Sequence, residues 1–91
     1  MASVGGDLQT LSDLFKKFTD AASQTEALRN SVDSAMNSAV WTGPNADNFR
    51  TSWSEFKATL TKIQQALTDG SVDVKNQHNN IAAATGAAER I

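Results

Sequence analysis

The chain has 91 residues, of which 40% are hydrophobic, with a formal net charge of −2 and no cysteine. A chain this short folds as one domain with a thin core, and without cysteine it has neither disulfides nor the commonest zinc ligands. Its acidic and basic residues are interspersed and form no cluster that could neutralise a run of phosphates, so we expect no binding to nucleic acid.

We expect the first six residues, MASVGG, to be a leader without regular structure. They lack the basic start and the apolar run of a secretory signal peptide. No later segment approaches the roughly 20 apolar residues of a membrane span. The few lysines on the polar faces also predict weak affinity for anionic lipid, so we do not expect a membrane to be a partner.

A long amphipathic helix is predicted over residues 7–41. Asp7 is the preferred N-cap, and Ser3 is the alternative if the helix begins earlier. Apolar residues then recur at spacings of three and four, without Pro or Gly between residues 7 and 40. The seam positions are Leu8, Leu11, Phe15, Phe18, Ala22, Val32, Met36 and Ala39, and the same apolar face is widened on one side by Leu14, Ala21, Leu28 and Ala35.

The tripeptide Trp41-Thr42-Gly43, followed by Pro44, predicts a turn at residues 42–44. Gly43 fits a helix C-cap in the left-handed conformation, and Pro44 fits the first position of a new helix. Asp47 would then lie near the new N-terminus, where the helix dipole favours a negative charge. A connection of about two to four residues makes the two helices antiparallel neighbours.

The second predicted helix covers residues 44–82 and has the more regular repeat. We interpret Gly70 as a small residue tolerated in the seam rather than as a hinge. Beyond residue 82 we expect a frayed tail to residue 91, which a docked partner could order as helix. Steps of three and four stay in phase through Ala46, Phe49, Trp53, Phe56, Leu60, Ile63, Leu67, Gly70, Val74, Gln77, Ile81, Ala84, Ala88 and Ile91.

The fold class is therefore predicted as all-α: an antiparallel two-helix hairpin, residues 1–91, that pairs into a four-helix-bundle dimer. One hairpin shares only one seam, so part of the wide apolar face would stay in water in a monomer, whereas pairing buries both seams. The alternative is a partly molten monomer or a fragment of a larger helical protein. The predicted dimer interface is Leu11, Phe15, Phe18, Val32, Trp41, Phe49, Trp53, Phe56, Leu60 and Ile63.

Trp41-Thr42-Gly43 lies mid-chain, in the only predicted turn between two long amphipathic helices. Together with the downstream run Ala46, Phe49, Trp53, Phe56 and Leu60, this arrangement resembles the WXG family of early-secreted-antigen-like proteins over nearly the whole chain. The resemblance implies a substrate or component of a type VII secretion system, exported from the cytoplasm as a folded dimer without an N-terminal signal peptide. It also implies that the indole of Trp41 packs against the partner chain at the hairpin tip; the alternative is that it only seals its own hairpin.

The resemblance also concerns the partners. Exported family members, or their partners, usually carry a Tyr-x-x-x-Asp/Glu signal in the C-terminal tail, the part of the dimer that would meet the secretion ATPase. This chain has no tyrosine. We therefore favour a heterodimer in which another WXG-type chain supplies the signal, and a homodimer is the alternative.

Catalysis is not expected. His78 is the only histidine, and its setting in KNQHNN predicts a solvated side chain. The carboxylates are scattered over polar faces, and the glycines form no phosphate-binding loop. We therefore expect no enzyme activity, no cofactor and no metal, and the alternative function is an intracellular coiled-coil adaptor that is not exported.

Overall fold

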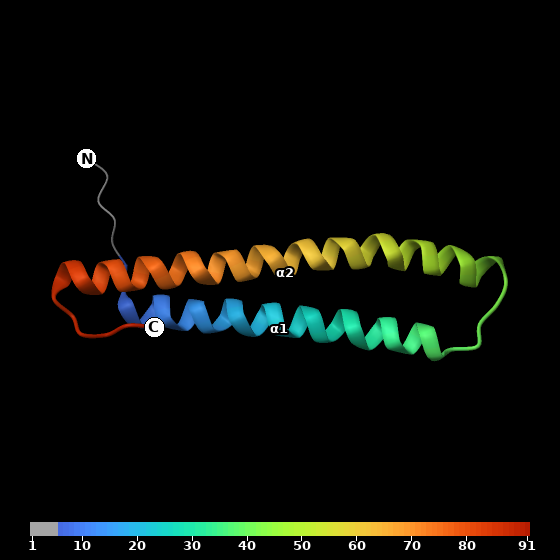
Figure 1. Cartoon of the computed structure of the whole chain (residues 1–91), viewed down its shortest axis with the longest axis horizontal. Coiled ribbons are helices and arrows are strands. Elements are labelled where there is room, and N and C mark those ends of the chain that lie inside the picture. Colours follow the sequence, from blue (N-terminus) through green and yellow to red (C-terminus); the bar gives the residue numbers. More distant parts are fainter. Residues whose placement is uncertain (1–5) are drawn as a thin grey trace.

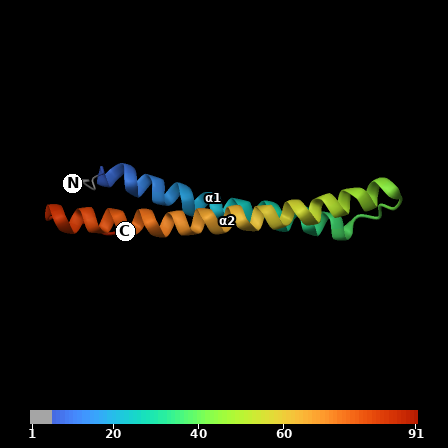
Figure 2. The ribbon, with the colours of Figure 1, turned by 90° about the horizontal axis from the view of Figure 1, so that it is seen from above.

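The computed structural model describes residues 6–91, which form two long antiparallel helices (Figure 1). Helix α1 spans Leu8–Ser38 and helix α2 spans Pro44–Thr85, and no strand occurs among residues 6–91. The hairpin measures 63 × 26 × 13 Å, so it is about one helix thick. Seen from above, the helices cross near mid-length (Figure 2). The predicted all-α class and the antiparallel packing of two helices are confirmed.

Helix α1 begins at the predicted cap but ends before residue 41. Oδ2 of Asp7 accepts a hydrogen bond of 2.9 Å from the backbone N–H of Thr10, which makes Asp7 the N-cap. At its other end α1 stops at Ser38, because Ala39 is extended, with φ −76° and ψ 136°. The extended backbone lets Trp41 fold back onto α2, where its ring centroid lies 5.8 Å from that of Phe49. This tertiary contact takes the place of the last predicted helical turn.

The connection between the helices covers residues 39–43, and Gly43 has a different role from the predicted one. Gly43 is not the C-cap of α1 but the N-cap of α2, with φ 114° and ψ 173°. Side-chain-bearing residues rarely adopt such a backbone. A Cβ at Gly43 would meet nothing within 4 Å, so the conformation, and not the space, requires glycine. Pro44 at the start of α2 and Asp47 in its first turn agree with the prediction.

Helix α2 continues without interruption through Gly70, which faces α1. A Cβ on Gly70 would lie 3.2 Å from Cε2 of Phe18. The missing side chain therefore leaves the space that the phenyl ring fills. The glycine permits a close contact between the helices and does not interrupt α2.

The core between the helices is thin. Its buried apolar side chains, among the residues described, are Ala22, Ala46, Leu60 and Ala82, and three of these four are alanines. A core of this size leaves most of the apolar area of the chain outside it.

The prediction that His78 is solvated is wrong, because its side chain is fully buried. The buried residues Leu60, Ser71 and Ala82 are eleven residues apart along α2. An α-helix drifts by about 20° per heptad relative to a strict 3.5-residue repeat, and an eleven-residue spacing follows the straighter helix. The buried face of α2 therefore leaves the heptad positions and reaches His78 toward the C-terminal end.

The end of α2 also differs from the predicted fraying beyond residue 82. The helix continues to Thr85, and Gly86 ends it in the left-handed conformation with φ 75°. The N–H of Ala87 donates to the carbonyl of Ala82 at 2.9 Å, and the N–H of Gly86 donates to that of Ala83, which is a Schellman motif. The chain then turns back along the hairpin (Figure 1).

Candidate interaction surface

Asp33 of α1 is the centre of a polar contact with α2. Its Oδ1 accepts hydrogen bonds of 3.1 Å from the indole N–H of Trp53 and from the ammonium group of Lys57. The bond from Trp53, followed by that from Lys57, lowers the pKa of Asp33 below its ordinary value. The contact holds the polar edge of the Trp53 ring against α1, while the rest of the ring borders an apolar groove.

A second polar contact lies one turn earlier along α1. The guanidinium group of Arg29 donates to Oγ1 of Thr61 at 3.0 Å and to Oε1 of Gln64 at 2.9 Å. The Nε2 of Gln64 donates in turn to Glu26 at 3.5 Å. With the contact at Asp33, these bonds oppose any sliding of one helix along the other.

An apolar groove of about 460 Å³ lies between the helices in this part of the hairpin. Its walls come from α1 on one side and from aromatic residues of α2 on the other. Leu28 is 53% exposed and Phe56 is 54% exposed, so the groove opens to solvent. The groove is lined by Leu28, Val32, Phe49, Ser52, Trp53 and Phe56.

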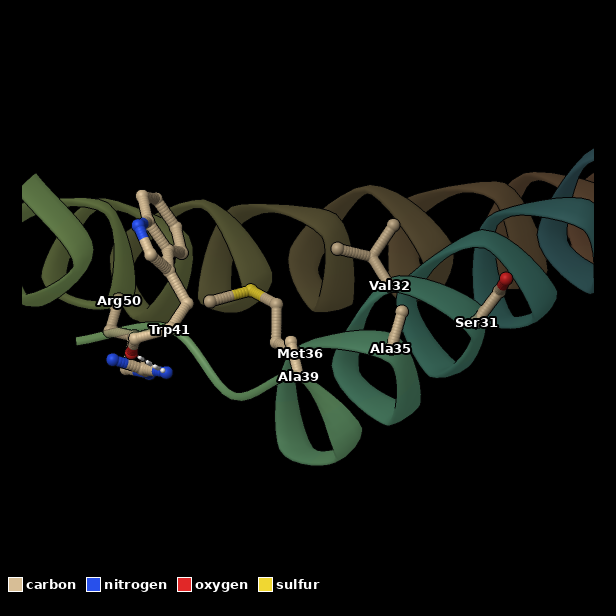
Figure 3. Close-up of a pocket in the computed structure, with 7 residues that line it drawn as sticks. All are labelled: Ser31, Val32, Ala35, Met36, Ala39, Trp41 and Arg50. Atoms are coloured by element: carbon tan, nitrogen blue, oxygen red, sulfur yellow. Dashed lines mark hydrogen bonds between the residues drawn. The ribbon is translucent and has the colours of Figure 1, made fainter.

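A smaller hollow of about 250 Å³ continues from the groove to the connection, sharing Val32 with it (Figure 3). Met36 extends from α1 toward the indole of Trp41 (Figure 3). Arg50 donates a hydrogen bond of 2.8 Å to the carbonyl of Trp41, and its guanidinium carbon lies 6.0 Å from the centre of the indole. Trp41 is thus fastened to α2 through its backbone while its side chain remains 43% exposed.

The structure brings four of the predicted interface residues together in the groove: Val32, Phe49, Trp53 and Phe56. Trp41 lines the adjoining hollow, and Ile63, which is 45% exposed, follows Phe56 at the heptad spacing.

The remaining predicted interface residues lie elsewhere. Leu60 is buried inside the hairpin, only 6% exposed, so its side chain packs within its own chain. Leu11, Phe15 and Phe18 are half-buried in the other half of the hairpin, away from the groove.

Leu28 and the polar contacts are absent from the predicted site. Leu28 belongs to the series of apolar residues that widens the apolar face of the first helix. Its place in that series could have predicted that it lines the groove. Asp33 carries no such signal, because its partners Trp53 and Lys57 lie 20 and 24 residues further along the chain. Only the register of the two helices brings these side chains together.

Comparisons with protein-family profiles, with curated proteins and with solved structures found no match. Among residues 6–91 no helix is long and apolar enough to cross a membrane. The same residues contain no group of three or more His, Asp or Glu side chains placed to hold a metal ion.

Proposed function

We propose that this chain acts by pairing with a second helical hairpin, through the apolar groove and Trp41, to form a four-helix bundle. The observation that carries the proposal is the set of large apolar side chains that the hairpin leaves about half exposed. Leu28, Phe49 and Phe56 line one groove, and Trp41 lies beside it. A continuous apolar surface of this kind marks an interaction site on a small protein.

The exposed area of the chain supports the same proposal. The chain exposes 6389 Å², whereas a compact protein of 9.7 kDa exposes about 5,100 Å². A standard stable interface buries about 800 Å² on each partner, well within this excess. A second hairpin laid on the groove would thicken a molecule whose smallest dimension is 13 Å.

We further propose that the dimer is a secreted substrate or component of a type VII secretion system, leaving the cytoplasm without an N-terminal signal peptide. Support comes from the resemblance to the WXG family and from the position of Trp41, Thr42 and Gly43 in the connection between two long helices. Because the chain has no tyrosine, the favoured partner is another WXG-type chain that supplies the tail signal for the secretion ATPase.

The solution mass of the purified chain, measured by light scattering on a sizing column, tests the pairing. We expect twice the monomer mass if the chain pairs with itself, and a poorly folded monomer if its partner is another chain. Phe56→Asp should abolish the dimer, whereas Val72→Asp, at a position 50% exposed outside the groove, should leave it intact. A well-folded, stable monomer at every concentration would contradict the pairing.

Trp41→Ala separates a partner contact from a purely internal one. We expect weaker dimerisation and weaker export, because the indole is exposed and available to a partner. The helix content should be largely kept, because Trp41 lies in the connection, after the end of α1 and before the start of α2. Complete unfolding would instead show that Trp41 is a core residue. Export is measured by comparing the amount of the chain in cell-free medium and in washed cells, with and without the secretion ATPase. A chain found only in the cells would favour the alternative function, an intracellular coiled-coil adaptor.

A further inference from the structure

The segment after Gly86 is held on α2 by one side chain. Nδ2 of Asn79 donates to the backbone oxygen of Ile91 at 3.2 Å, and Oδ1 of Asn79 accepts from the N–H of Ile91 at 3.0 Å. The amide side chain thus bonds both backbone groups of a single residue, as a neighbouring strand would. Ile91 and Ala87 are both half-buried in this arrangement.

His78 orients the amide of Asn79. Its Nδ1 lies 3.0 Å from Oδ1 of Asn79, the oxygen that also accepts from the N–H of Ile91. Since that oxygen accepts, Nδ1 is the donor in this contact. The other ring nitrogen, Nε2, is buried and has no hydrogen-bond partner among the described residues. A buried polar atom without a partner is destabilising, so the folded-back arrangement contains an unfavourable group.

The same segment has a second conformation available to it. Ile81, Ala84, Ala88 and Ile91 continue the apolar steps of α2 in phase, so a helical form would place them on one face. Gly86, in the left-handed conformation, ends the helix at this point. Figure 1 shows that α2 runs past the first turn of α1, so the end of α2 has no helix beside it. The folded-back segment lies beside this end of α2, on the side where α1 runs further along the hairpin (Figure 1).

We propose that residues 86–91 are a strap with two positions. In the closed position the strap is bonded to Asn79 and occupies the end of α2. In the open position it extends α2 as helix and offers Ile81, Ala84, Ala88 and Ile91 to a helix of a second hairpin, so pairing releases it. The release of the strap by a second hairpin rests on the proposed function, whereas the closed position of the strap does not.

Amide hydrogen exchange at Ile91, followed by NMR at low concentration, tests the closed position. We expect protection of about tenfold or more in the wild type, because two hydrogen bonds hold this residue. Asn79→Ala should remove the protection, and Asn80→Ala should keep it, since Asn80 is exposed and both changes raise helix propensity equally. An unprotected Ile91 in the wild type, or protection that survives Asn79→Ala, would overturn the strap.

Gly86→Ala tests the open position. Alanine is disfavoured in the left-handed conformation and favoured in a helix, so the change should shift the equilibrium toward helix by at least about tenfold. The Cα chemical shifts of residues 87–90 should then move to helical values. Non-helical shifts in this variant would overturn the open position.

The link to pairing is tested on the wild-type chain above the concentration at which its mass doubles. Helical shifts at residues 87–90 in the dimer would support release of the strap, and unchanged shifts in a proven dimer would overturn it. If the chain stays monomeric at every concentration, self-pairing fails, while Ile91 exchange and Gly86→Ala still decide the strap.

Discussion

The two halves of the hairpin differ in how they cover the apolar side chains between the two helices. In the tip half, residues 26–64, large apolar side chains stay about half exposed and polar bonds from Arg29 and Asp33 hold the helices together. In the open half, residues 6–25 and 65–91, His78 and Ala82 are fully buried, and Phe18 fills the space beside Gly70. The chain's own residues 86–91 then cover the end of α2.

The difference shows which half depends on a partner. Small residues let the helices of the open half approach closely, so that half closes with its own side chains. The tip half carries most of the aromatic area, and two helices alone cannot surround it. The groove of the tip half is therefore the surface on which a second chain would bury the most apolar area.

The largest effect on folding is expected from Leu60→Ala. Leu60 is the only large apolar side chain buried in the tip half of the described hairpin. Its loss should lower the free energy of unfolding by about 2–5 kcal/mol, measured with urea at fixed protein concentration. Val72→Ala, at an exposed position of α2, should cost less than about 0.5 kcal/mol. Equal effects of the two changes would mean that the tip half has no core of its own.

Gly43→Ala should come next. The φ of 114° places this residue in a region that only glycine adopts readily, so alanine should destabilise the connection by about 1–3 kcal/mol. Thermal unfolding of the variant and of Thr42→Ala, a neighbour without such a conformation, measures the difference. A variant as stable as the wild type would show that the tip adopts another backbone in solution.

Gly70→Ala examines the close packing of the open half. The helix-propensity gain of about 1 kcal/mol should be cancelled by the contact of 3.2 Å with Phe18. In a Phe18→Leu background the gain should appear, giving a coupling of about 1 kcal/mol in a double-mutant cycle. Equal effects in both backgrounds would show that the two residues do not touch.

The smallest effect concerns acid stability of the tip half. The pKa of Asp33 is lowered in the folded chain, first by Trp53 and then by Lys57, so the carboxylate stabilises the fold above its unfolded pKa. That contribution is lost as the pH falls through the lower folded pKa, below about pH 4. The difference in unfolding free energy between wild type and Asp33→Asn should therefore shrink in acid.

A control separates the two causes at Asp33. Trp53→Phe keeps an aromatic ring but removes the indole N–H, so it should reduce the acid dependence more than Lys57→Met does. If the difference in unfolding free energy between wild type and Asp33→Asn stays constant down to pH 2, Asp33 is not bonded to α2 in solution.

Local rules were sufficient for most of the secondary structure. The spacing of apolar residues predicted two long helices, Asp7 predicted the start of the first, and Pro44 predicted the start of the second. These signals act between residues within one or two helical turns, so a sequence contains them directly. Four of the six residues that line the groove were predictable for the same reason. Phe49, Trp53 and Phe56 belong to one regular stripe, and Val32 belongs to the stripe of the first helix.

The sequence by itself thus determined the helices, their antiparallel order and the apolar stripe that leaves a groove open. The tertiary structure alone decided that α1 ends at Ser38, that His78 is buried and that residues 86–91 fold back onto Asn79. The first and third depend on contacts between α2 and a segment beside it, Trp41 with Phe49 and Asn79 with Ile91, and the burial of His78 follows from the drift of α2 away from a strict heptad. A repeat of three and four residues determines neither the path of a non-helical segment nor that drift.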